Sequence, residues 1–421
     1  MTLSYTDLTL PTYKNTRIIG AIGSTPLTVT DVINANLLAR NNVFLAGKKG
    51  TGKTQVVRDL YRHRYGGRGM MIEGRPDLKV SELYTHANLQ KLREGTARSS
   101  EEIIELAQAV DWPFIGVDEL NRAPEITQNE LLSILNGYLL HQGRPIPLGG
   151  GNSVGVATGN LGNGGYVGTF KIDDALMDRL HLFLDLDFYK PTDEDMIEID
   201  DQMSSDPRVR DAPIRDIAES IQAAQQEVTQ IPLSLEAVIA ARYMERALDY
   251  CDLFPSAGNS KDNLKEAWPT ICVQKNCPRK ETSCARVKAI GERTVRAAKR
   301  CAQGLQYVAK LKDPQAEEDH LGALLLAMRL MLPSAGVISP AYARSEGNFN
   351  NLNLTAQHIM DDLEQEIRRE FFAGGQGPLT NALAFAAGRK LQEHPYQPTN
   401  AAWKFVEPLL HKINKEAESD E

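Results

Sequence analysis

Hydrophobic residues in the first half of the chain fall into short apolar runs separated by segments with helical spacing. Apolar runs of this length, bounded by Gly, Pro or charged residues, are typical of buried strands. The runs cover residues 42–46, 69–74, 113–118, 153–160 and 180–188. Segments between them, such as residues 99–110 and 126–140, repeat apolar positions at the helical period. This alternation predicts a three-layer α/β domain over residues 1–190, with a parallel sheet covered by helices on both faces.

The pattern changes after residue 190, where strands give way to long segments with helical periodicity. These segments cover residues 212–228, 234–250, 293–311 and 318–332. They predict an α-helical domain over residues 191–335. A passage rich in Gly, Asn, Ser and Pro, residues 332–354, leads into a helical C-terminal region, which we assign to residues 336–421. Its acidic end, residues 416–421, is expected to be frayed.

Composition narrows the class of protein. The chain has 421 residues, of which 42% are hydrophobic and 24% charged, which is ordinary for a globular protein. A formal net charge of -8 gives no overall reason to expect nucleic-acid binding, although a local basic pore or groove remains compatible with it. The N-terminus lacks an apolar signal region, and the longest apolar stretch, residues 321–333, is interrupted by Arg329. We therefore expect a cytoplasmic protein without a membrane span.

The stretch "GKKGTGKT" follows the first apolar run and precedes a helix with Val56, Val57 and Leu60 on one face. It fits the phosphate-loop pattern G-x-x-x-x-G-K-[ST] at every fixed position. In such a loop the backbone N–H groups surround a triphosphate, Lys53 reaches the β- and γ-phosphates, and Thr54 offers its hydroxyl to magnesium. The alternative, a Gly-rich turn without a ligand, is disfavoured by the position between strand and helix. The predicted nucleotide-binding residues are Gly47, Lys48, Lys49, Gly50, Thr51, Gly52, Lys53 and Thr54.

Two acids, Asp118 and Glu119, stand at the carboxyl end of the run 113–118. Parallel strands bring such ends to the edge of the sheet where the phosphate loop lies. Asp118 is then placed to hold magnesium, and Glu119 to polarise the water that attacks the γ-phosphate. The alternative is that both acids only favour the N-terminus of the following helix. Asn160 ends another strand and could orient that water, although an Asn after a strand is more often a turn residue.

Several stretches together resemble the MoxR family of AAA+ ATPases. The run "DELNRAPEITQNELLSILNGYLL", with Asn-Arg-Ala-Pro after the acids and a Thr-Gln pair at the next helix, is similar to the family's second acidic motif. "RPDLKVSEL" resembles its Pro-Asp-Leu segment and "VATGN" its sensor strand. "FKIDDALMDRLHLFLDLDFYKPTDEDMIEI" resembles its Leu-Asp-Arg element and the strand that follows. The resemblance extends over residues 20–335 and is closest in the nucleotide-binding core.

The resemblance implies a P-loop α/β core followed by a helical lid, with ATP and Mg²⁺ as cofactors. It assigns Asn160 to the first sensor, and the preference for ATP over GTP follows from the family alone. Arg179 matches the position that reaches a neighbouring subunit's γ-phosphate, where a guanidinium stabilises the transition state. Its alternative is a surface arginine paired with a nearby Asp. Arg293 is the implied second sensor, with Arg296 next in line, although arginines on helices usually belong to solvated faces.

An insertion interrupts the predicted lid at residues 251–288 and carries cysteines. The chain has five cysteines, an odd number that argues against a disulfide framework. Three alternatives remain for the four in the insertion: reduced thiols without a ligand, a structural zinc site, or an iron-sulfur cluster. These four are Cys251, Cys272, Cys277 and Cys284. The fifth, Cys301, lies in a helical segment and is predicted to belong to the core.

Other conspicuous residues have structural interpretations. Leu161 and a Gly-rich stretch follow Asn160 where the family has Pro, which indicates a loop with its own shape. His141 lies in a short polar hairpin between helix and strand and lacks partner ligands in the sequence; family members project this loop toward the pore of the ring. Trp112 and Trp268 are predicted to be packing anchors, because no basic tract surrounds them.

The resemblance also carries an expectation of function. An arginine acting on the neighbouring subunit implies a ring, expected to be a hexamer, that hydrolyses ATP and remodels or matures a protein partner. Family members often work with a partner that has a von Willebrand factor A domain. Two alternatives remain: a nucleotide-dependent switch or assembly protein with little hydrolysis, and a ring motor on nucleic acid. The roles of Asn121 and Arg122 are not evident from the sequence, and a contact across the ring interface is one hypothesis.

Overall fold

The fold is taken from a computed structural model of the chain. It describes residues 3–80, 83, 112–141, 144–148, 151–160, 180–203, 211–246, 286–288, 290–372, 377–387, 396 and 401–419. Within these ranges the chain divides into two compact units. The first comprises Met1–Pro232 and Arg300–Ala323, and the second comprises Leu233–Lys299 and Leu324–Glu421. The division of the sequence into three domains at residues 190 and 335 stays a prediction.

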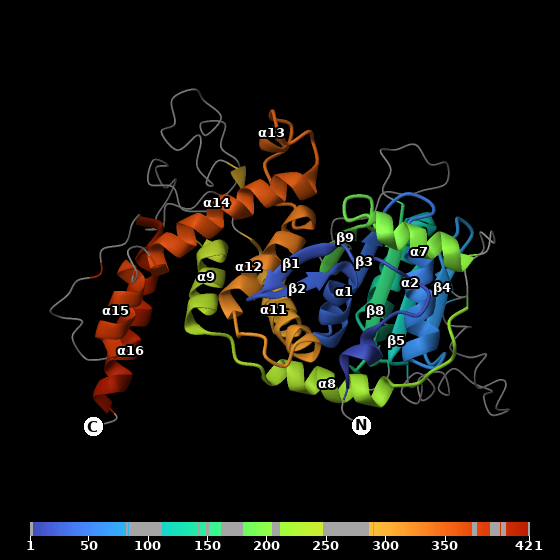
Figure 1. Ribbon diagram of the computed structural model, residues 1–421, viewed down its shortest axis with the longest axis horizontal. Coiled ribbons are helices and arrows are strands. Elements are labelled where there is room, and N and C mark those ends of the chain that lie inside the picture. The colour runs from blue at the N-terminus through green and yellow to red at the C-terminus, as the bar shows by residue number, and fades with distance from the viewer. Residues whose placement is uncertain are drawn as a thin grey trace. The chain divides into compact units, whose positions relative to one another are not determined.

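The first unit is built on a parallel five-stranded sheet with the order β4-β5-β8-β3-β9 (Figure 1). Its strands are β3 (Val43–Ala46), β4 (Met70–Glu73), β5 (Phe114–Asp118), β8 (Val154–Gly159) and β9 (Leu182–Asp185). All neighbouring strands pair in parallel. Every strand expected from an apolar run is present, and the predicted α/β fold class is confirmed. The carboxyl ends of β3, β5 and β8 therefore meet at one edge, where open sheets of this kind bind ligands.

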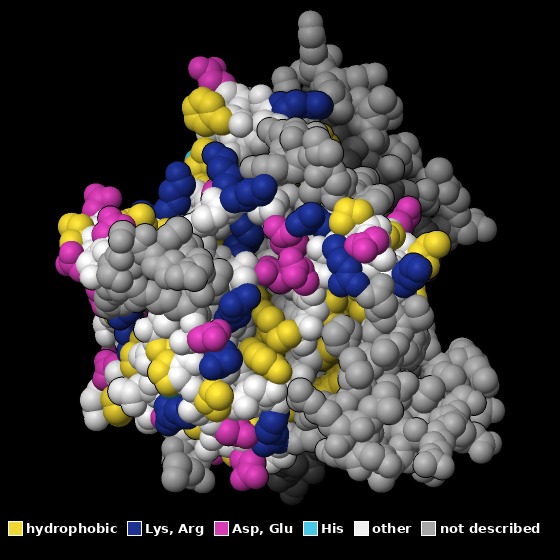
Figure 2. Space-filling view, turned by 90° about the vertical axis from the view of Figure 1, so that its right-hand side faces the viewer, with side chains coloured by type: hydrophobic (Ala, Val, Ile, Leu, Met, Phe, Trp, Pro, Cys, Tyr) yellow, Lys and Arg dark blue, Asp and Glu magenta, His cyan; other side chains and the backbone are white. Residues whose placement is uncertain are grey.

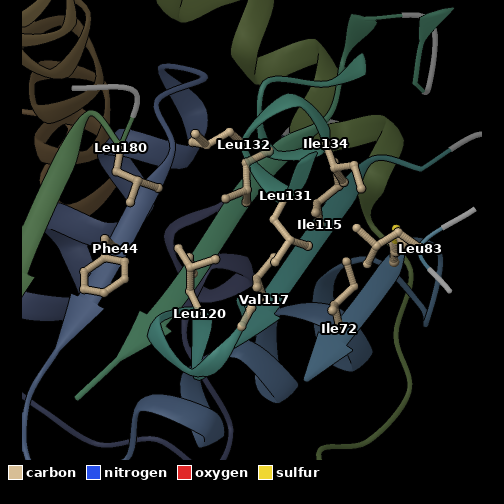
Figure 3. Close-up of a cluster of buried hydrophobic side chains, with 14 of the residues drawn as sticks. Phe44, Ile72, Leu83, Ile115, Val117, Leu120, Leu131, Leu132, Ile134 and Leu180 are labelled. Carbon is tan, nitrogen blue, oxygen red and sulfur yellow. The ribbon is translucent and has the colours of Figure 1, made fainter. Parts of the chain in front are cut away.

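Helices cover both faces of this sheet, as the side chains of β5 demonstrate. Ile115 and Val117 pack against α5 (Glu125–Leu135) in the buried cluster that Figure 3 draws. Phe114 points to the other face, where its ring stacks on that of Tyr65 at 5.0 Å between centroids. On that second face α2 (Lys53–Asp59) buries Val56, Val57 and, in the wider turn η2 (Leu60–Arg64), Leu60. The predicted parallel sheet with helices on both faces is thus observed.

Two elements before the phosphate loop were not predicted from the apolar pattern. A hairpin of β1 (Ile18–Ile22) and β2 (Thr25–Thr28) leads into α1 (Val29–Leu38). Thr28 and Asp31 form a capping box at the start of α1, which satisfies N–H groups of its first turn. All but one residue of α1 is buried, including two asparagines, so the helix has no polar face to produce an amphipathic period.

Beyond β9 the named elements are helical, as predicted. They are α7 (Asp193–Met203), α8 (Ala218–Gln230), α9 (Leu235–Arg246), α11 (Glu292–Lys312), α12 (His320–Met331), η7 (Leu332–Ser334), α13 (Pro340–Ala343), α14 (Leu352–Phe372), α15 (Pro378–Ala387), η9 (Ala401–Val406) and α16 (Glu407–Ser419). The helix α16 continues into the acidic end as far as Ser419, and the expectation that this end frays stays a prediction. Among the residues described, no helix is both long and apolar enough to cross a bilayer.

Smaller elements complete the first unit. They are η1 (Tyr5–Leu8), η3 (Leu120–Arg122) and the antiparallel hairpin of β6 (Tyr138–His141) and β7 (Arg144–Pro147). The hairpin predicted around His141 is confirmed, with His141 paired opposite Arg144 at its tip. Trp112 is buried in the cluster between the sheet and α5, as expected of a packing anchor, whereas Trp268 lies outside the described residues. Cys301 is fully buried, which confirms its prediction as a core residue.

Candidate active site

The loop between β3 and α2 holds the predicted phosphate-binding residues. Gly52 directly precedes α2 and has a left-handed backbone with φ 81°. A side chain there is strained by this conformation, and its Cβ would come within 2.9 Å of the Tyr13 ring. Glycine is therefore required at this point both by backbone conformation and by close packing. The loop wraps around the N-terminus of α2, which is the arrangement that suits an anion.

Lys53 opens α2 and is directed back into its own loop. Its ammonium donates to the carbonyl oxygens of Gly47 and Lys48, at 2.8 and 2.6 Å, and contacts Thr51 Oγ1 at 3.3 Å. The residue is only 7% exposed. Burial lowers the pKa of the Lys53 ammonium, and three nearby carboxylates, with Asp187 the strongest, act in the opposite direction. A single buried cation thus lies at the centre of the loop.

Asp118, at the end of β5, is held on both of its carboxylate oxygens. Thr54 Oγ1 donates to Asp118 Oδ2 at 2.9 Å, which joins the first turn of α2 to the acidic strand. Thr158 Oγ1 of β8 donates to Asp118 Oδ1. The hydroxyl of Thr54 and the carboxylate of Asp118, both hard oxygen donors, therefore converge at the sheet edge. Oxygen ligands of this kind suit Mg²⁺, so these two residues fit a magnesium site beside Lys53.

Glu119 follows Asp118 but differs from it in backbone conformation and in its side-chain partner. Its backbone is left-handed, with φ 51°, and its N–H donates to Thr158 Oγ1 at 2.9 Å. Glu119 Oε2 forms an ion pair with Arg122 Nη1. Both side chains remain partly open to solvent, at 26% and 40% exposure respectively. The hydrogen bond that the Arg122 guanidinium donates to Glu119 raises the pKa of Arg122, so this cation stays charged across the accessible pH range.

Asn160 comes directly after β8, the strand that lies between β5 and β3. It is 7% exposed, and its Oδ1 has no hydrogen-bond partner within the described part of the chain. Asn121 reaches Asn160 from the loop after β5: its Nδ2 donates to the Asn160 carbonyl at 2.9 Å, and its Oδ1 accepts from the Asn160 N–H at 3.3 Å. The structure thus brings the phosphate loop, both acids and Asn160 to one edge of the sheet.

Comparison with known proteins supplies the family of this site. Residues 25–149 match the family model described as the MoxR domain in the MoxR-vWA-beta-propeller ternary systems. The chain carries a MoxR domain. The matched residues include the phosphate loop, both acids and α5, so the resemblance to MoxR-family AAA+ ATPases expected from these stretches is confirmed. A search of curated proteins found no relative of the chain.

One of two similar solved structures supports the fold. A protein from Cytophaga hutchinsonii ATCC 33406, named as a candidate ATPase, is 16% identical with a TM-score of 0.53. The match covers 80% of this chain and 87% of that protein. A full-length MCM homolog from Methanopyrus kandleri is 13% identical with a TM-score of 0.41, over 73% of this chain and 55% of its own. The similarity to the first structure shows a shared fold over most of the chain.

A segment before the MoxR domain supports the phosphate loop and was missed in the sequence. Asp59, fully buried in α2, accepts from the backbone N–H groups of Thr12 and Tyr13, both at 2.9 Å, and from Gln55 Nε2 at 2.8 Å. These bonds hold the Tyr13 ring against Gly52. Only the polar residues themselves stand out in the sequence, and nothing in their spacing indicates that residues 12–13 return to the loop.

Side chains typical of the MoxR pattern also turn out to connect its pieces. Thr127 Oγ1, in the first turn of α5, donates to the carbonyl of Leu78 at 2.8 Å, so the Thr-Gln pair is joined to the Pro-Asp-Leu segment. Gln128 Nε2 donates to the Ala123 carbonyl at 2.9 Å and fixes the entry of the chain into α5. Asp187 beyond β9 accepts from the Lys48 N–H at 3.0 Å. The motif names these residues, but only the fold provides their partners.

The remaining predicted site residues are not brought into the site by the described structure. Arg179 and the insertion cysteines Cys251, Cys272, Cys277 and Cys284 lie outside the described residues. Arg293 is exposed at the start of α11 and belongs to the second unit. Arg296, one turn on, pairs with Glu292 at 2.6 Å on the exposed face. Within the described ranges, no group of three or more His, Cys, Asp or Glu residues could hold a metal ion.

Proposed function

We propose that the MoxR domain hydrolyses ATP with Mg²⁺. The observation that carries the proposal is the 2.9 Å contact between Thr54 Oγ1 and Asp118 Oδ2 beside the buried Lys53 ammonium. This arrangement joins a cation for phosphate, two oxygen donors for the metal, and the N-terminus of α2. A Gly-rich turn without a ligand would give no reason to keep a lysine buried among the oxygens of its own loop.

Each group has a distinct part in this chemistry. The loop N–H groups and Lys53 bind the phosphates, and Thr54 and Asp118 hold magnesium, which supplies charge neutralisation on the phosphate oxygens when bound. Lys53 must exchange its bonds to the Gly47 and Lys48 carbonyls for bonds to phosphate oxygen. Thr158 keeps the Asp118 carboxylate aimed at Thr54. This exchange leaves the sheet unchanged and confines rearrangement to the loop.

Glu119 is the proposed general base. A carboxylate one residue beyond the metal ligand can accept a proton from the attacking water, and its N–H is fixed by Thr158. Arg122 holds one of its oxygens, Oε2, and leaves Oε1 for a water. Asn160, with its unpartnered and buried Oδ1, is the proposed first sensor that orients this water or touches the γ-phosphate.

We further propose a ring, expected to be a hexamer, in which Arg179 acts on the ATP of the neighbouring subunit. Support comes from the MoxR family pattern at this residue. An arginine supplied across an interface typically accelerates hydrolysis about a thousandfold or more. Arg293, with Arg296 as the second choice, is the proposed second sensor in the lid. Activity would then depend on assembly, and lid movement would transmit force to a protein bound to the ring.

The proposed partner is a protein with a von Willebrand factor A domain. The matching family model is named for MoxR-vWA-beta-propeller ternary systems, and this name favours a remodelling or maturation role in such a system. We expect this work to take place in the cytoplasm. A structural zinc bound by the insertion cysteines stays a separate prediction, for which metal analysis of the purified protein by mass spectrometry is the direct measurement.

A ring motor on nucleic acid is less well supported. The chain has a net charge of -8. On the face drawn in Figure 2, several Lys and Arg side chains of the described residues lie close together in the upper middle, and elsewhere they are interspersed with Asp and Glu side chains. A phosphate backbone binds through clustered cations, so the negative net charge, more than this face, disfavours a nucleic-acid motor. Adding single- or double-stranded DNA to the ATPase assay tests this function, because a motor should be stimulated.

Steady-state ATP hydrolysis by wild type, Glu119→Gln and Arg179→Ala tests the main proposal. We expect wild type to hydrolyse ATP and each variant to lose at least about 99% of the rate, in line with the loss of a base or an arginine finger. Mixing the two inactive variants should restore part of the rate, because a Glu119→Gln subunit can supply its intact arginine to its neighbour. A wild type that binds ATP without hydrolysing it would instead favour a nucleotide-dependent switch.

Affinity isolation with Glu119→Gln addresses the partner. This variant should accumulate the ATP-bound ring and retain its client, whereas Lys53→Met, which should bind ATP about a hundredfold more weakly, serves as the matched negative at low ATP concentration. A protein with a von Willebrand factor A domain recovered only with Glu119→Gln would support the proposed partner. Equal recovery with both variants would contradict a partner that binds the ATP state.

A further inference from the structure

Asn121 makes a two-point contact with the backbone of a residue on another strand. Its Nδ2 donates to the Asn160 carbonyl at 2.9 Å while its Oδ1 accepts from the Asn160 N–H at 3.3 Å. Because one atom donates and the other accepts, the pattern fixes the orientation of the Asn121 amide. The residue is 2% exposed, so water does not compete for these bonds. Asn121 thus satisfies both the N–H and the carbonyl of Asn160, as the backbone of a neighbouring strand would.

Asn160 needs such a contact because it lies beyond the regular sheet. The pairing of β8 with β5 ends at Val117 and Ala157, and its pairing with β3 ends at Ala46 and Gly159. Asn160 is the next residue, opposite the first residue of the phosphate loop. Its Oδ1 is buried without a partner among the described residues, and such a group is unfavourable unless a ligand or water completes it.

We propose that Asn121 is a positioning residue that sets where Asn160 stands beside the phosphate loop. The inference rests on the proposed ATPase function and adds a residue to which the motif assigns no chemistry. Asn121 follows the proposed base by only two residues, so one short loop fixes both the base and the first sensor. A shift of about 1 Å in a group that orients a reactant can lower the rate about a hundredfold.

Two substitutions of Asn121 test this role by steady-state ATP hydrolysis. Asn121→Ala removes both hydrogen bonds. Asn121→Asp keeps the size and the acceptor for the Asn160 N–H, but it turns a carboxylate oxygen toward the Asn160 carbonyl. We expect kcat to fall about ten- to a hundredfold in both variants, while KM changes by less than about threefold, because Asn160 acts on the attacking water rather than on binding. A kcat within about twofold of wild type in either variant would overturn the proposal.

A double-mutant cycle with Asn160→Ala separates positioning from a general loss of structure. If Asn121 acts only through Asn160, the double variant Asn121→Ala, Asn160→Ala should hydrolyse ATP at the rate of Asn160→Ala alone. Multiplied losses in the double variant would show that Asn121 acts independently of Asn160 and would overturn the inference. The cycle uses the full chain, so it does not depend on any fragment folding alone.

Asn34→Ala is the matched control for stability. Asn34 is equally buried in the same unit and donates from Nδ2 to the Leu8 carbonyl at 3.0 Å, away from the loop. Asn34→Ala should lower the melting temperature about as much as Asn121→Ala does, while kcat stays unchanged. An equal fall of kcat in Asn34→Ala would mean that destabilisation alone explains the effect. Should wild type itself fail to hydrolyse ATP, the proposed function fails, whereas an active wild type with unchanged Asn121 variants refutes this inference alone.

Discussion

The loops that follow β3 and β5 lie at the same edge of the sheet, but different contacts hold them in place. The loop after β3 is held by its glycines and by Lys53, which bonds to the carbonyls of the loop itself. The loop after β5 is held to the neighbouring strand β8 by hydrogen bonds of side chains. Thr158 of β8 bonds to Asp118 and to the Glu119 N–H, and Asn121 of the loop bonds to the backbone of Asn160. The first loop can rearrange around a ligand, while the second is preorganised.

Under the proposed ATPase function, this difference separates nucleotide binding from chemistry within the MoxR domain. A loop that satisfies its own lysine can exchange those bonds for phosphate without disturbing the sheet. Groups that act in the transition state gain most when they need no reorganisation as the reaction proceeds. We therefore expect removal of Lys53 in the first loop to reduce affinity for ATP, and removal of the buried side chains that hold the second loop, Thr158 and Asn121, to reduce both kcat and the free energy of unfolding.

The largest effect is expected for Lys53→Met. Loss of the ammonium should weaken ATP binding about a hundredfold, because a charge-assisted contact to phosphate contributes about 1.5–3 kcal/mol. The free energy of unfolding should change by about 1 kcal/mol or less, because removing the ammonium relieves the cost of its burial while it leaves the Gly47 and Lys48 carbonyls without this donor. Titration with a fluorescent ATP analogue and urea denaturation measure the two quantities. A large loss of stability with affinity retained would break the comparison.

Thr158→Val should have the next largest effect. In contrast to Lys53→Met, it should lower kcat and the free energy of unfolding more than the affinity for ATP. The isosteric change removes a buried hydroxyl that bonds to Asp118 and Glu119, so the free energy of unfolding should fall by about 1–3 kcal/mol. We expect kcat to fall at least about tenfold while the affinity for ATP stays within about threefold. Thr355→Val is the control, because Thr355 is equally buried and bonds to the Asn351 carbonyl at 2.7 Å in the second unit. It should lose stability without losing kcat.

Comparing Gly52→Ala with Gly50→Ala tests how far the first loop depends on packing. Both glycines have φ near the left-handed region, at 81° and 83°, so each alanine should lower the free energy of unfolding by about 1–2 kcal/mol. Only at Gly52 would the new Cβ meet Tyr13, whereas the space around Gly50 is open. Gly52→Ala should therefore be less stable than Gly50→Ala by about 1 kcal/mol or more in urea denaturation. Equal values would mean that Tyr13 yields freely.

The smallest effect is expected for Arg122→Ala. Its ion pair with Glu119 is partly exposed, so its loss should change the free energy of unfolding by less than about 1 kcal/mol. Because Glu119 Oε2 becomes free to accept from water, we expect kcat to rise about twofold. Arg368→Ala removes a comparably exposed pair with Glu364 in the second unit and should leave kcat unchanged. A fall in kcat would mean that Arg122 supports the base instead of restraining it.

The apolar pattern was sufficient for the sheet and most helices of the described structure. Runs such as residues 113–118 are buried on both faces, so every position is constrained to be apolar and the strand is visible in the sequence. The helix α1 is not visible in the apolar pattern, because a helix buried on nearly all sides has no polar stripe and its buried asparagines are indistinguishable in the sequence from surface residues. The β1–β2 hairpin was missed because half-exposed short strands carry little pattern.

The site was predictable where chemistry restricts the residue type. Phosphate binding demands glycines, a lysine and a hydroxyl at set spacing, so residues 47–54 could be found without a structure. Thr158, Asn121 and Asp59 have partners 40, 39 and up to 47 residues away along the chain, and no local spacing reports such contacts. The sequence therefore names the groups that touch the ligand better than the groups that hold them.

The left-handed backbone of Glu119 separates what folding favours from what catalysis requires. An L-residue with a side chain is less stable in that conformation than glycine by about 1 kcal/mol or more. Selection for folding alone would thus favour Gly at this position, and the acid persists there against that preference. A thermostabilising screen that ignored activity would be drawn to Glu119→Gly and would discard the proposed base. A residue whose replacement would make the protein more stable but less active marks a place where stability is given up for chemistry.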